Sequence, residues 1–162
     1  MSDSRSSPDG TNGPVESVRE FVTATTGSQL CGIPVLKVQD VLGPQRITPI
    51  PLAPFEVAGS LNLRGRIVTA IDLRTRLGLT LHADIKNEMS IVVEHHGELY
   101  SLMIDAVGEV LKMSASKFER NPATLDPIWR GFSEGVYRLT EGLLVVLDVD
   151  TLLDFGKQKD AA

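Results

Sequence analysis

Arginine side chains are concentrated in one short stretch of the chain, Gly59 to Leu79, with the sequence GSLNLRGRIVTAIDLRTRLGL. A guanidinium group is planar and always charged, so it can hold a carboxylate or a carbonyl oxygen through two parallel hydrogen bonds. This chemistry suits recognition of another protein. Charge clusters are also common on solvated faces, where salt bridges contribute little to stability. Both interpretations apply to the four arginines of this stretch, Arg64, Arg66, Arg74 and Arg76.

The residues that commonly support catalysis or bind metals do not occur in a matching pattern. Asp72 precedes one short helical segment, and either Asp148 or Asp150 can cap the last one. We therefore expect Asp72 and Asp148 to lie at helix starts rather than to form a catalytic pair. The histidines His82, His95 and His96 lack the spacing of a zinc site. Adjacent His95 and His96 are expected on opposite faces of a strand. The sequence therefore predicts no metal.

Cys31 is the only cysteine, which excludes an internal disulfide and favours the cytoplasm. It lies in an apolar segment, so we expect a small core residue rather than a nucleophile. The chain has no GxSxG sequence, and the glycines Gly59 and Gly65 are not followed by the Lys-Ser/Thr of a phosphate-binding loop. We therefore predict neither an enzyme nor a cofactor, although a small hydrolase with an unrecognised site is an alternative.

The overall composition excludes several classes of partner. The 162 residues carry a net charge of −5 with an isoelectric point of about 5.2, whereas binding to nucleic acid or anionic lipid calls for a basic surface. Aromatic residues make up only 5%, too few for stacking on single strands. No apolar run approaches the roughly 20 residues that span a bilayer, and residues 1–17 lack the apolar part of a secretory signal. We expect no nucleic acid and no membrane insertion.

Short strands are the elements that must position the arginines. Leu61 and Leu63 alternate with polar residues, Arg64-Gly65-Arg66 suits a tight turn, and the run 67–71 predicts a second strand. Segment 35–42 is predicted as a strand, although its spacing also suits a helix. Prolines and glycines predict long loops at 43–56 and 112–131. Further strands are expected at 20–26, 30–33, 90–94, 99–104, 105–111, 132–139 and 143–147, and short helices at 73–77 and 151–155.

The chain contains an internal repeat. At an offset of 76 residues, Gly59, Leu61, Leu63, Asp72, Leu73 and Leu77 match Gly135, Tyr137, Leu139, Asp148, Val149 and Leu153. Gly27 matches Gly97 at offset 70, and segment 38–42 matches 107–111 at offset 69. The residues Asn62, Arg64 and Arg66 are not repeated in the second half, because Arg138, Thr140 and Gly142 occupy the equivalent positions. The repeated residues therefore look like scaffold, and the charged turn is where we expect function.

Two repeated units of short strands predict a mainly β fold with two five-stranded barrels, because closure removes exposed strand edges. We expect a disordered tail at 1–18, a first barrel at 19–83, a second barrel at 84–155, and a short C-terminal tail at 156–162. The short helices are expected either to plug the barrel ends or to cover the seam between the barrels.

Several of these segments resemble the CheW family, the scaffold proteins of bacterial chemotaxis arrays. The likeness covers roughly residues 19–155. It is carried by GIPVLKVQDV at 32–41, by Asn62-Leu63-Arg64-Gly65 followed by Asp72-Leu73-Arg74, and by the end of the second half from Gly135 to Leu153. The resemblance implies two SH3-like barrels, in agreement with the repeat.

The resemblance also implies the partners. Family members couple the cytoplasmic tips of methyl-accepting chemoreceptors to the regulatory domain of the histidine kinase CheA. The strand that contains Val38 and Asp40 and the arginine Arg64 bear on receptor coupling. The receptor's helical hairpin lies in a groove between the barrels, and CheA contacts the barrel ends, so that rings of alternating CheA and CheW form.

The residues themselves support such a surface. Leu36, Val38 and Val41 suit an apolar floor for a docked helix, whose apolar side chains recur at three- and four-residue spacing. Arg64, next to Asn62 in the turn, suits a bidentate contact that fixes the register of the partner. Arg66 and Arg74 are candidates for further contacts, and Arg74 alternatively pins a helix through an internal ion pair. We predict a chemotaxis adaptor, and another peptide-binding barrel is the alternative.

Overall fold

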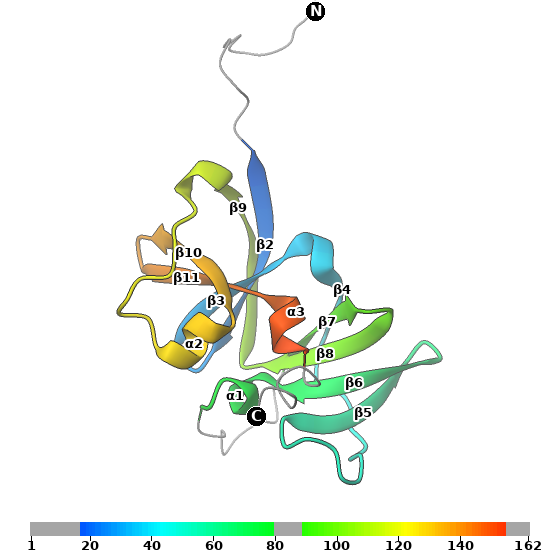
Figure 1. Ribbon diagram of the computed structural model, residues 1–162. Helices are drawn as coiled ribbons and strands as arrows, with labels where there is room; N and C mark the ends of the chain where they lie inside the picture. The colour runs from blue at the N-terminus through cyan, green and yellow to red at the C-terminus, as the bar shows by residue number, and fades with distance from the viewer. Residues whose placement is uncertain (1–16, 80–88, 155–162) are drawn as a thin grey trace, which may run out of the picture.

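The computed structural model describes residues 17–79 and 89–154. Ten strands form two five-stranded sheets, with short helices between and beside them (Figure 1). The first sheet has the order β10-β11-β3-β2-β9 and the second has the order β4-β7-β8-β6-β5. The prediction of a mainly β fold with two five-stranded units is confirmed.

The strand boundaries lie close to the predicted ones. In the first sheet they are β2 (Val18–Thr26), β3 (Gln29–Pro34), β9 (Ala106–Ser114), β10 (Ser133–Leu139) and β11 (Gly142–Leu147). In the second sheet they are β4 (Val38–Leu42), β5 (Val57–Leu63), β6 (Arg66–Asp72), β7 (Met89–His95) and β8 (Glu98–Ile104). The segment 35–42, which also suited a helix, is divided between the 3₁₀ turn η2 (Val35–Lys37) and β4.

Two of the α-helices begin at the aspartates that the sequence assigned as caps. The carboxylate of Asp72 accepts a hydrogen bond from the backbone of Thr75 at the start of α1 (Leu73–Arg76). Asp148 accepts one from Thr151 at the start of α3 (Val149–Leu152). The capping prediction is confirmed. The helix expected at 151–155 starts two residues earlier, and residue 155 lies outside the described part of the chain.

The prediction of one long loop over 112–131 is wrong. This segment contains the end of β9, the 3₁₀ turn η3 (Ala115–Lys117) and α2 (Pro127–Gly131). Pro127 begins a helix instead of breaking one, because a proline in the first helical turn loses no hydrogen bond through its missing N–H. Asp126 caps this helix by accepting a hydrogen bond from Ile128 at 2.8 Å.

The two halves of the repeat exchange their first hairpins. Hairpin β2–β3 from the first half lies in the sheet of β9, β10 and β11, while β7–β8 from the second half lies in the sheet of β4, β5 and β6. Each exchanged hairpin joins its sheet through a parallel strand pair. β3 pairs with β11, and β8 pairs with β6. The expectation that 19–83 and 84–155 each build their own barrel is therefore corrected. The boundary between them, and both predicted tails apart from residues 17 and 18, lie outside the described residues.

Both sheets curl until their edges meet. Thr48, which follows edge strand β4, pairs with Ser60 of the opposite edge strand β5. In the first sheet Glu119, which follows β9, pairs with Val136 of β10. These two bridges occupy equivalent places in the repeat, since residues 60 and 136 differ by the same 76 positions. They give each sheet the closed character of a small barrel.

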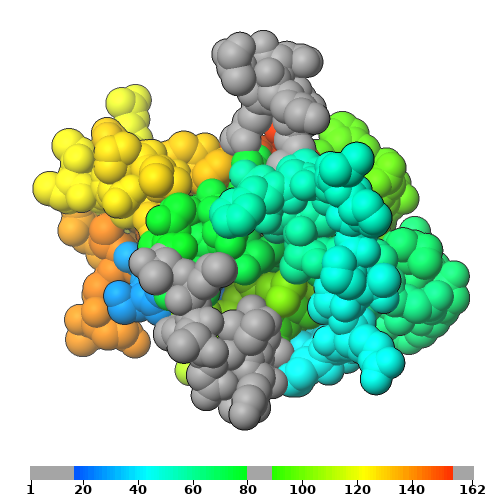
Figure 2. Space-filling model, turned by 90° about the horizontal axis from the view of Figure 1, so that it is seen from below, coloured from blue at the N-terminus to red at the C-terminus, as the bar shows by residue number. Residues whose placement is uncertain are grey.

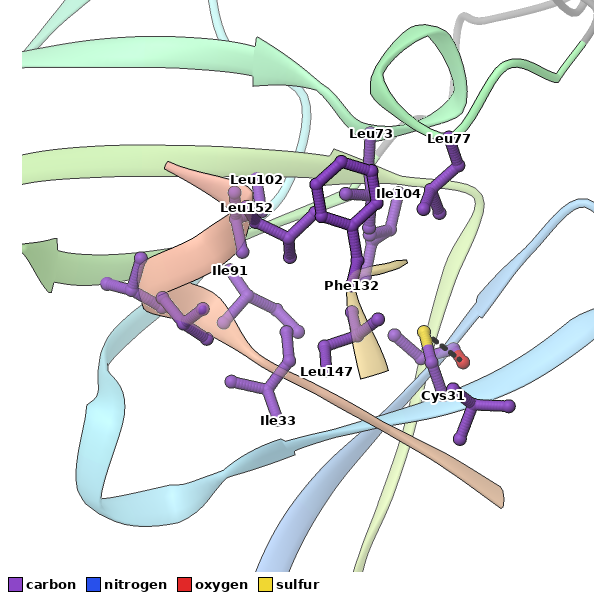
Figure 3. Packing of buried hydrophobic residues seen from close by; sticks show 14 of the residues in the cluster. Cys31, Ile33, Leu73, Leu77, Ile91, Leu102, Ile104, Phe132, Leu147 and Leu152 are labelled. Atoms are coloured by element: carbon purple, nitrogen blue, oxygen red, sulfur yellow. Dashed lines mark hydrogen bonds between the residues drawn. The ribbon is translucent and has the colours of Figure 1, made fainter. Parts of the chain in front are cut away.

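The largest hydrophobic core lies between the two sheets and draws on both (Figure 3). Ile33 and Leu147 come from the first sheet, and Ile91 and Leu102 from the second. Leu73 of α1, Leu77 at its C-cap, and Val149 and Leu152 of α3 belong to this core, so these helices cover the seam rather than plug the barrel ends. Such a shared core makes the two barrels one folding unit.

Trp129 and Cys31 also belong to this core. Trp129 of α2 is almost fully buried, which matches the packing alternative for this side chain rather than that of an exposed anchor. Cys31 is fully buried with its sulfur 3.3 Å from the carbonyl oxygen of Ala24 (Figure 3). Burial raises the pKa of the Cys31 thiol to about 12, so it is protonated at neutral pH and a poor nucleophile.

The bridge between Thr48 and Ser60 requires the glycine that precedes Ser60. A Cβ on Gly59 would lie 2.3 Å from the carbonyl oxygen of Thr48, and the φ angle of Gly59 is +151°, which other residues rarely adopt. We therefore expect Gly59→Ala to lower the free energy of unfolding by about 2 kcal/mol or more, measured by chemical denaturation. Gly43→Ala is the matched control, because a Cβ there meets no atom within 4 Å. Equal stability of the two variants would contradict this account of the bridge.

Candidate partner-binding surface

Arg64 lies at the tip of the β5–β6 hairpin, which projects from the body of the protein (Figure 1). Its φ angle is 52°, and the turn is held by a hydrogen bond from the backbone of Gly65 to the side-chain oxygen of Asn62 at 3.0 Å. An asparagine suits this position because its side chain can stand in for a backbone acceptor in a tight turn. Asn62 therefore shapes the turn that presents Arg64.

The Arg64 guanidinium donates a hydrogen bond to a carboxylate oxygen of Asp40 at 2.8 Å. The other oxygen of Asp40 accepts a hydrogen bond from the backbone of Val41 at 2.8 Å. The Arg64 hydrogen bond, and then the Val41 one, hold the pKa of Asp40 below its usual value. Because β4 and the β5–β6 hairpin lie at opposite edges of the second sheet, this ion pair spans the closing seam of the barrel.

The Arg64 side chain remains 75% exposed although it is paired, whereas Asp40 is 24% exposed. An arginine has five N–H donors, and one is used here. The guanidinium is thus held in a fixed direction and still available to a second acceptor from solvent or from a partner.

The apolar residues beside the ion pair differ in accessibility. Leu36 in η2 is 96% exposed and Val41 in β4 is 39% exposed. Val38 is half-buried and packs against the core between the sheets. Val38 and Val41 are three positions apart, so the regular alternation of β4 places them on opposite faces. Of the three residues expected as an apolar floor, Leu36 and Val41 are thus the ones that face outwards.

The structure separates the four arginines of this stretch into two kinds. Arg64 and Arg66 are exposed on the hairpin. Arg74 donates to Asp105 at 2.7 Å, and the two side chains are only 12% and 17% exposed. Arg76 is buried, donates to the carbonyl oxygen of Leu152 and lies over the ring of Phe132.

Arg74 occupies a structural position at the seam. The same carboxylate oxygen of Asp105 also accepts a hydrogen bond from the backbone of Gly27 at 2.9 Å. The ion pair therefore joins α1 to the β2–β3 turn and to the junction after β8. This arrangement is the internal ion pair that the sequence left open for Arg74, and so little of the side chain is exposed that we leave it out of the partner surface.

Sequence reasoning missed an exposed apolar loop between β4 and β5. Leu52 and Phe55 are 104% and 83% exposed, and Ile50 is 40% exposed. Figure 2 shows the atoms of this loop, in cyan to blue-green, spread over one side of the lower face. The signal was present in the sequence, since these large apolar residues stand between prolines where no strand can bury them. Exposed apolar residues gathered in one loop suggest a contact surface.

The histidine pair lies elsewhere, at the seam near α3. Nδ1 of His95 is 3.0 Å from a carboxylate oxygen of Asp150, and Lys37 lies 3.4 Å from the same group. The hydrogen bond to His95 is the main cause that lowers the pKa of Asp150. The expectation that His95 and His96 face opposite sides is wrong, because His96 has a φ angle of 53° in the turn and the rings are 4.0 Å apart. Among the described residues no group of His, Cys, Asp and Glu could hold a metal ion.

Comparison with known proteins identifies the family. The model of the CheW-like domain matches residues 20–156, most of the chain. The chain belongs to the CheW family. The fold described above is therefore that of a family of chemotaxis scaffold proteins, and the resemblance stated from the sequence is confirmed.

Individual relatives agree with this assignment. The chain is 30% identical over 135 residues to chemotaxis protein CheW of Klebsiella aerogenes, covering 83% of this chain and 81% of that protein. It is 26% identical over 144 residues to chemotaxis protein CheW of Rhizobium meliloti, covering 89% and 92%. It superimposes on the crystal structure of scaffolding protein TtCheW from Thermoanaerobacter tengcongensis with a TM-score of 0.76 at 28% identity, covering 85% of this chain and 94% of that one.

The helices of this CheW-family chain are short. None of them, within the described ranges, has the length and apolar character needed to cross a bilayer.

The lowered pKa of Asp40 provides a test of the ion pair. In Arg64→Gln the main cause of the shift is removed, so we expect the pKa of Asp40 to rise towards its usual value, measured by NMR titration of the carboxyl carbon. Because the folded-state pKa is lowered, the pair stabilises the fold above the unfolded-state pKa, and this contribution is lost as the pH falls through the folded-state value. Arg66→Gln is the control, and an equal shift in both variants would contradict a specific pair.

The two kinds of arginine should respond differently to loss of charge. Arg74→Gln removes the positive charge that faces the largely buried carboxylate of Asp105. We therefore expect the free energy of unfolding to fall by about 3 kcal/mol. Arg66→Gln, on the exposed hairpin, is expected to change it by less than about 0.5 kcal/mol. Urea denaturation of both variants measures the difference. If Arg74→Gln left the free energy of unfolding unchanged, Arg74 would again be a candidate for the partner surface.

Proposed function

We propose that this CheW-family chain couples the cytoplasmic tips of methyl-accepting chemoreceptors to the regulatory domain of CheA. The observation that carries the proposal is the exposed, ion-paired Arg64 beside exposed apolar residues on a member of a chemotaxis scaffold family. The role requires simultaneous binding of two partners and no chemical step. It places the protein in the cytoplasm, recruited to membrane-associated receptor arrays.

The receptor contact is proposed on β4, η2 and the β5–β6 turn. A receptor tip is a helical hairpin, and a helix presents apolar side chains along one face. Leu36 and Val41 supply exposed apolar area for that face. Arg64 supplies hydrogen-bond donors for a carboxylate or a carbonyl oxygen at its edge. Arg66, exposed on the same hairpin, adds positive charge that favours an acidic partner.

The ion pair with Asp40 prepares Arg64 for this contact. A free arginine side chain loses rotamer freedom when a partner orders it, which costs about 0.5–1.5 kcal/mol. The hydrogen bond to Asp40 at 2.8 Å restrains the guanidinium before the partner arrives. Asp40 also offsets the charge of Arg64, so a partner must match the direction of the remaining donors rather than merely supply negative charge.

A scaffold needs a second surface for its second partner. The exposed loop with Leu52 and Phe55, and Ile67 at 67% exposure beside the hairpin tip, offer apolar area distinct from Leu36 and Val41. We propose that CheA uses such exposed barrel surfaces. If CheA domains contact two different surfaces of the barrels, alternating CheA and CheW-like units can assemble into rings, because every scaffold then joins two CheA neighbours.

The variant Arg64→Glu tests the receptor contact. It places a carboxylate beside Asp40, so we expect the hairpin tip to move while the core is kept, as judged by circular dichroism. Receptor-dependent control of CheA activity should fall at least tenfold in a mixture of purified CheA, receptor signalling fragment and this protein. Arg66→Glu makes the same change of charge two residues away and should have a smaller effect.

A charge exchange separates the ion pair from the partner contact. The double variant Asp40→Arg with Arg64→Glu restores an ion pair across the seam but moves the guanidinium to β4. If Arg64 touches the receptor, kinase control stays low in the double variant. Full recovery would show that only the pair matters and would remove Arg64 from the contact. No binding of the unaltered protein to either partner at tens of micromolar would overturn the proposed function as a whole.

A further inference from the structure

We call the barrel of the sheet β10-β11-β3-β2-β9 the first barrel and that of the sheet β4-β7-β8-β6-β5 the second barrel. The second barrel has a partly open cavity of about 390 Å³ that does not belong to the proposed partner surface. It lies between the chain that follows β4 and the inner faces of β5, β7 and β8. Its lining is mostly apolar, with Ile47, Leu61 and Met103 among the larger side chains. Ser90 and Ser101 are the hydroxyl-bearing residues of the lining, and none of the lining side chains is charged. Pockets for small molecules usually begin at about 300 Å³.

The cavity exists because the interior of the second barrel is built from smaller side chains than that of the first. The first barrel is filled by Phe21, Tyr137 and Phe118, with ring centroids 5.6 and 5.3 Å apart around Tyr137. At four equivalent positions of the repeat the second barrel has the smaller residue. The pairs are Leu61 for Tyr137, Val68 for Leu144, Ala70 for Val146 and, through the matching bridges, Ile47 for Phe118.

Ser101 is an exception to this trend, because its counterpart in the first barrel is smaller. Ser101 pairs with Ala70 as Gly32 pairs with Val146, so Ser101 and Gly32 are equivalent. The two hairpins are thus related by an offset of 69, and the match of Gly27 with Gly97 at offset 70 is wrong by one residue. A Cβ on Gly32 would already lie 3.2 Å from the Cβ of Phe21. In the second barrel a whole hydroxymethyl group is accommodated and is 1% exposed.

Within residues 17–79 and 89–154 the hydroxyl of Ser101 has no hydrogen-bond partner. A buried hydroxyl without a partner costs about 1–3 kcal/mol. In its present rotamer the hydroxyl is shielded from a water-sized molecule, so a polar atom in the cavity recovers this energy when the Ser101 side chain turns about its Cα–Cβ bond towards the cavity. A single water molecule needs two to four polar partners, and water filling the whole space would face Leu61, Ile47 and Met103 over most of its surface. An apolar molecule with one oxygen matches the lining better.

We propose that this cavity binds a small, uncharged, mostly apolar molecule that places one hydrogen-bonding oxygen against Ser101. A charged group is disfavoured because no lining side chain would neutralise it. Met89 and Met103 have flexible, polarisable side chains that adapt to ligands of different outline. The inference stands on the cavity alone and does not depend on the coupling function.

Methionine methyl NMR tests the proposal with built-in controls. The chain has four methionines, of which Met89 and Met103 line the cavity and Met113 lies in the first barrel. The full-length protein with ¹³C-methyl methionine is titrated with benzyl alcohol, toluene and benzoate. We expect saturable shifts of Met89 and Met103, but not of Met113, with the first two probes. Benzyl alcohol should bind roughly 3- to 10-fold more tightly than toluene because of one hydrogen bond, and benzoate should not bind.

Substitutions assign the effect to the cavity. Ser101→Ala should abolish the preference for benzyl alcohol over toluene while toluene still binds. Ile47→Phe, which copies Phe118 of the other barrel, should weaken both probes at least tenfold by filling the space. Ala58→Leu is a second filling variant if Ile47→Phe does not fold.

Three results would overturn the proposal. Shifts that stay linear with probe concentration, or that appear equally at Met113, would show non-specific contact only. An unchanged preference in Ser101→Ala would remove the hydroxyl from recognition. Unchanged binding in a folded filling variant would place the probes outside the cavity.

Discussion

The structure depends on the parallel pairing of strands that come from different halves of the repeat. β3 pairs with β11, and β6 pairs with β8, so each barrel is completed by the first hairpin of the other half. A hairpin alone is marginally stable in water and needs further strands or a packed face. Here neither half can bury its first hairpin by itself. The core between the sheets, with Ile33 and Ile91 on the exchanged hairpins, therefore forms only when both halves are present.

This dependence explains how much of the fold the sequence could predict. The positions of the strands, the aspartate caps at Asp72 and Asp148 and the equivalence of Gly59 and Gly135 follow from local patterns that repeat along the chain. The exchange of hairpins leaves no such pattern, because β2–β3 and β7–β8 present similar alternating faces and either could complete either barrel. Only the side chains of the complete core decide between them. The helix α2 was missed for a local reason, since Pro127 starts a helix as readily as it ends a strand.

The candidate surface was predictable in part for the same reasons. Arg64 was singled out because it lies in a turn that breaks the repeat, and the structure places it on an exposed tip. Its pairing with Asp40 was not predictable, because the two residues are 24 positions apart and meet only when the edges of the barrel close. Arg74 and Arg76 looked alike in sequence, yet the shared core and the β2–β3 turn bury them. Burial by an exchanged hairpin cannot be deduced from neighbours in the chain.

The two barrels have similar strands but differ in how densely their interiors are packed. The less densely packed barrel is the one that carries the proposed receptor surface. The first barrel is packed with aromatic rings, while the second has a cavity and bears the Arg64–Asp40 pair on its outer edge. Leu61 lines the cavity on β5, three residues before Arg64, and Gly43 lines it immediately after β4. The two strands that the ion pair joins therefore have one side against the cavity and the other towards solvent. Because an underpacked interior tolerates movement that a filled one resists, the second barrel is the one whose edge can adjust when a partner binds. The densely packed first barrel keeps its structure while the edge of the second barrel moves.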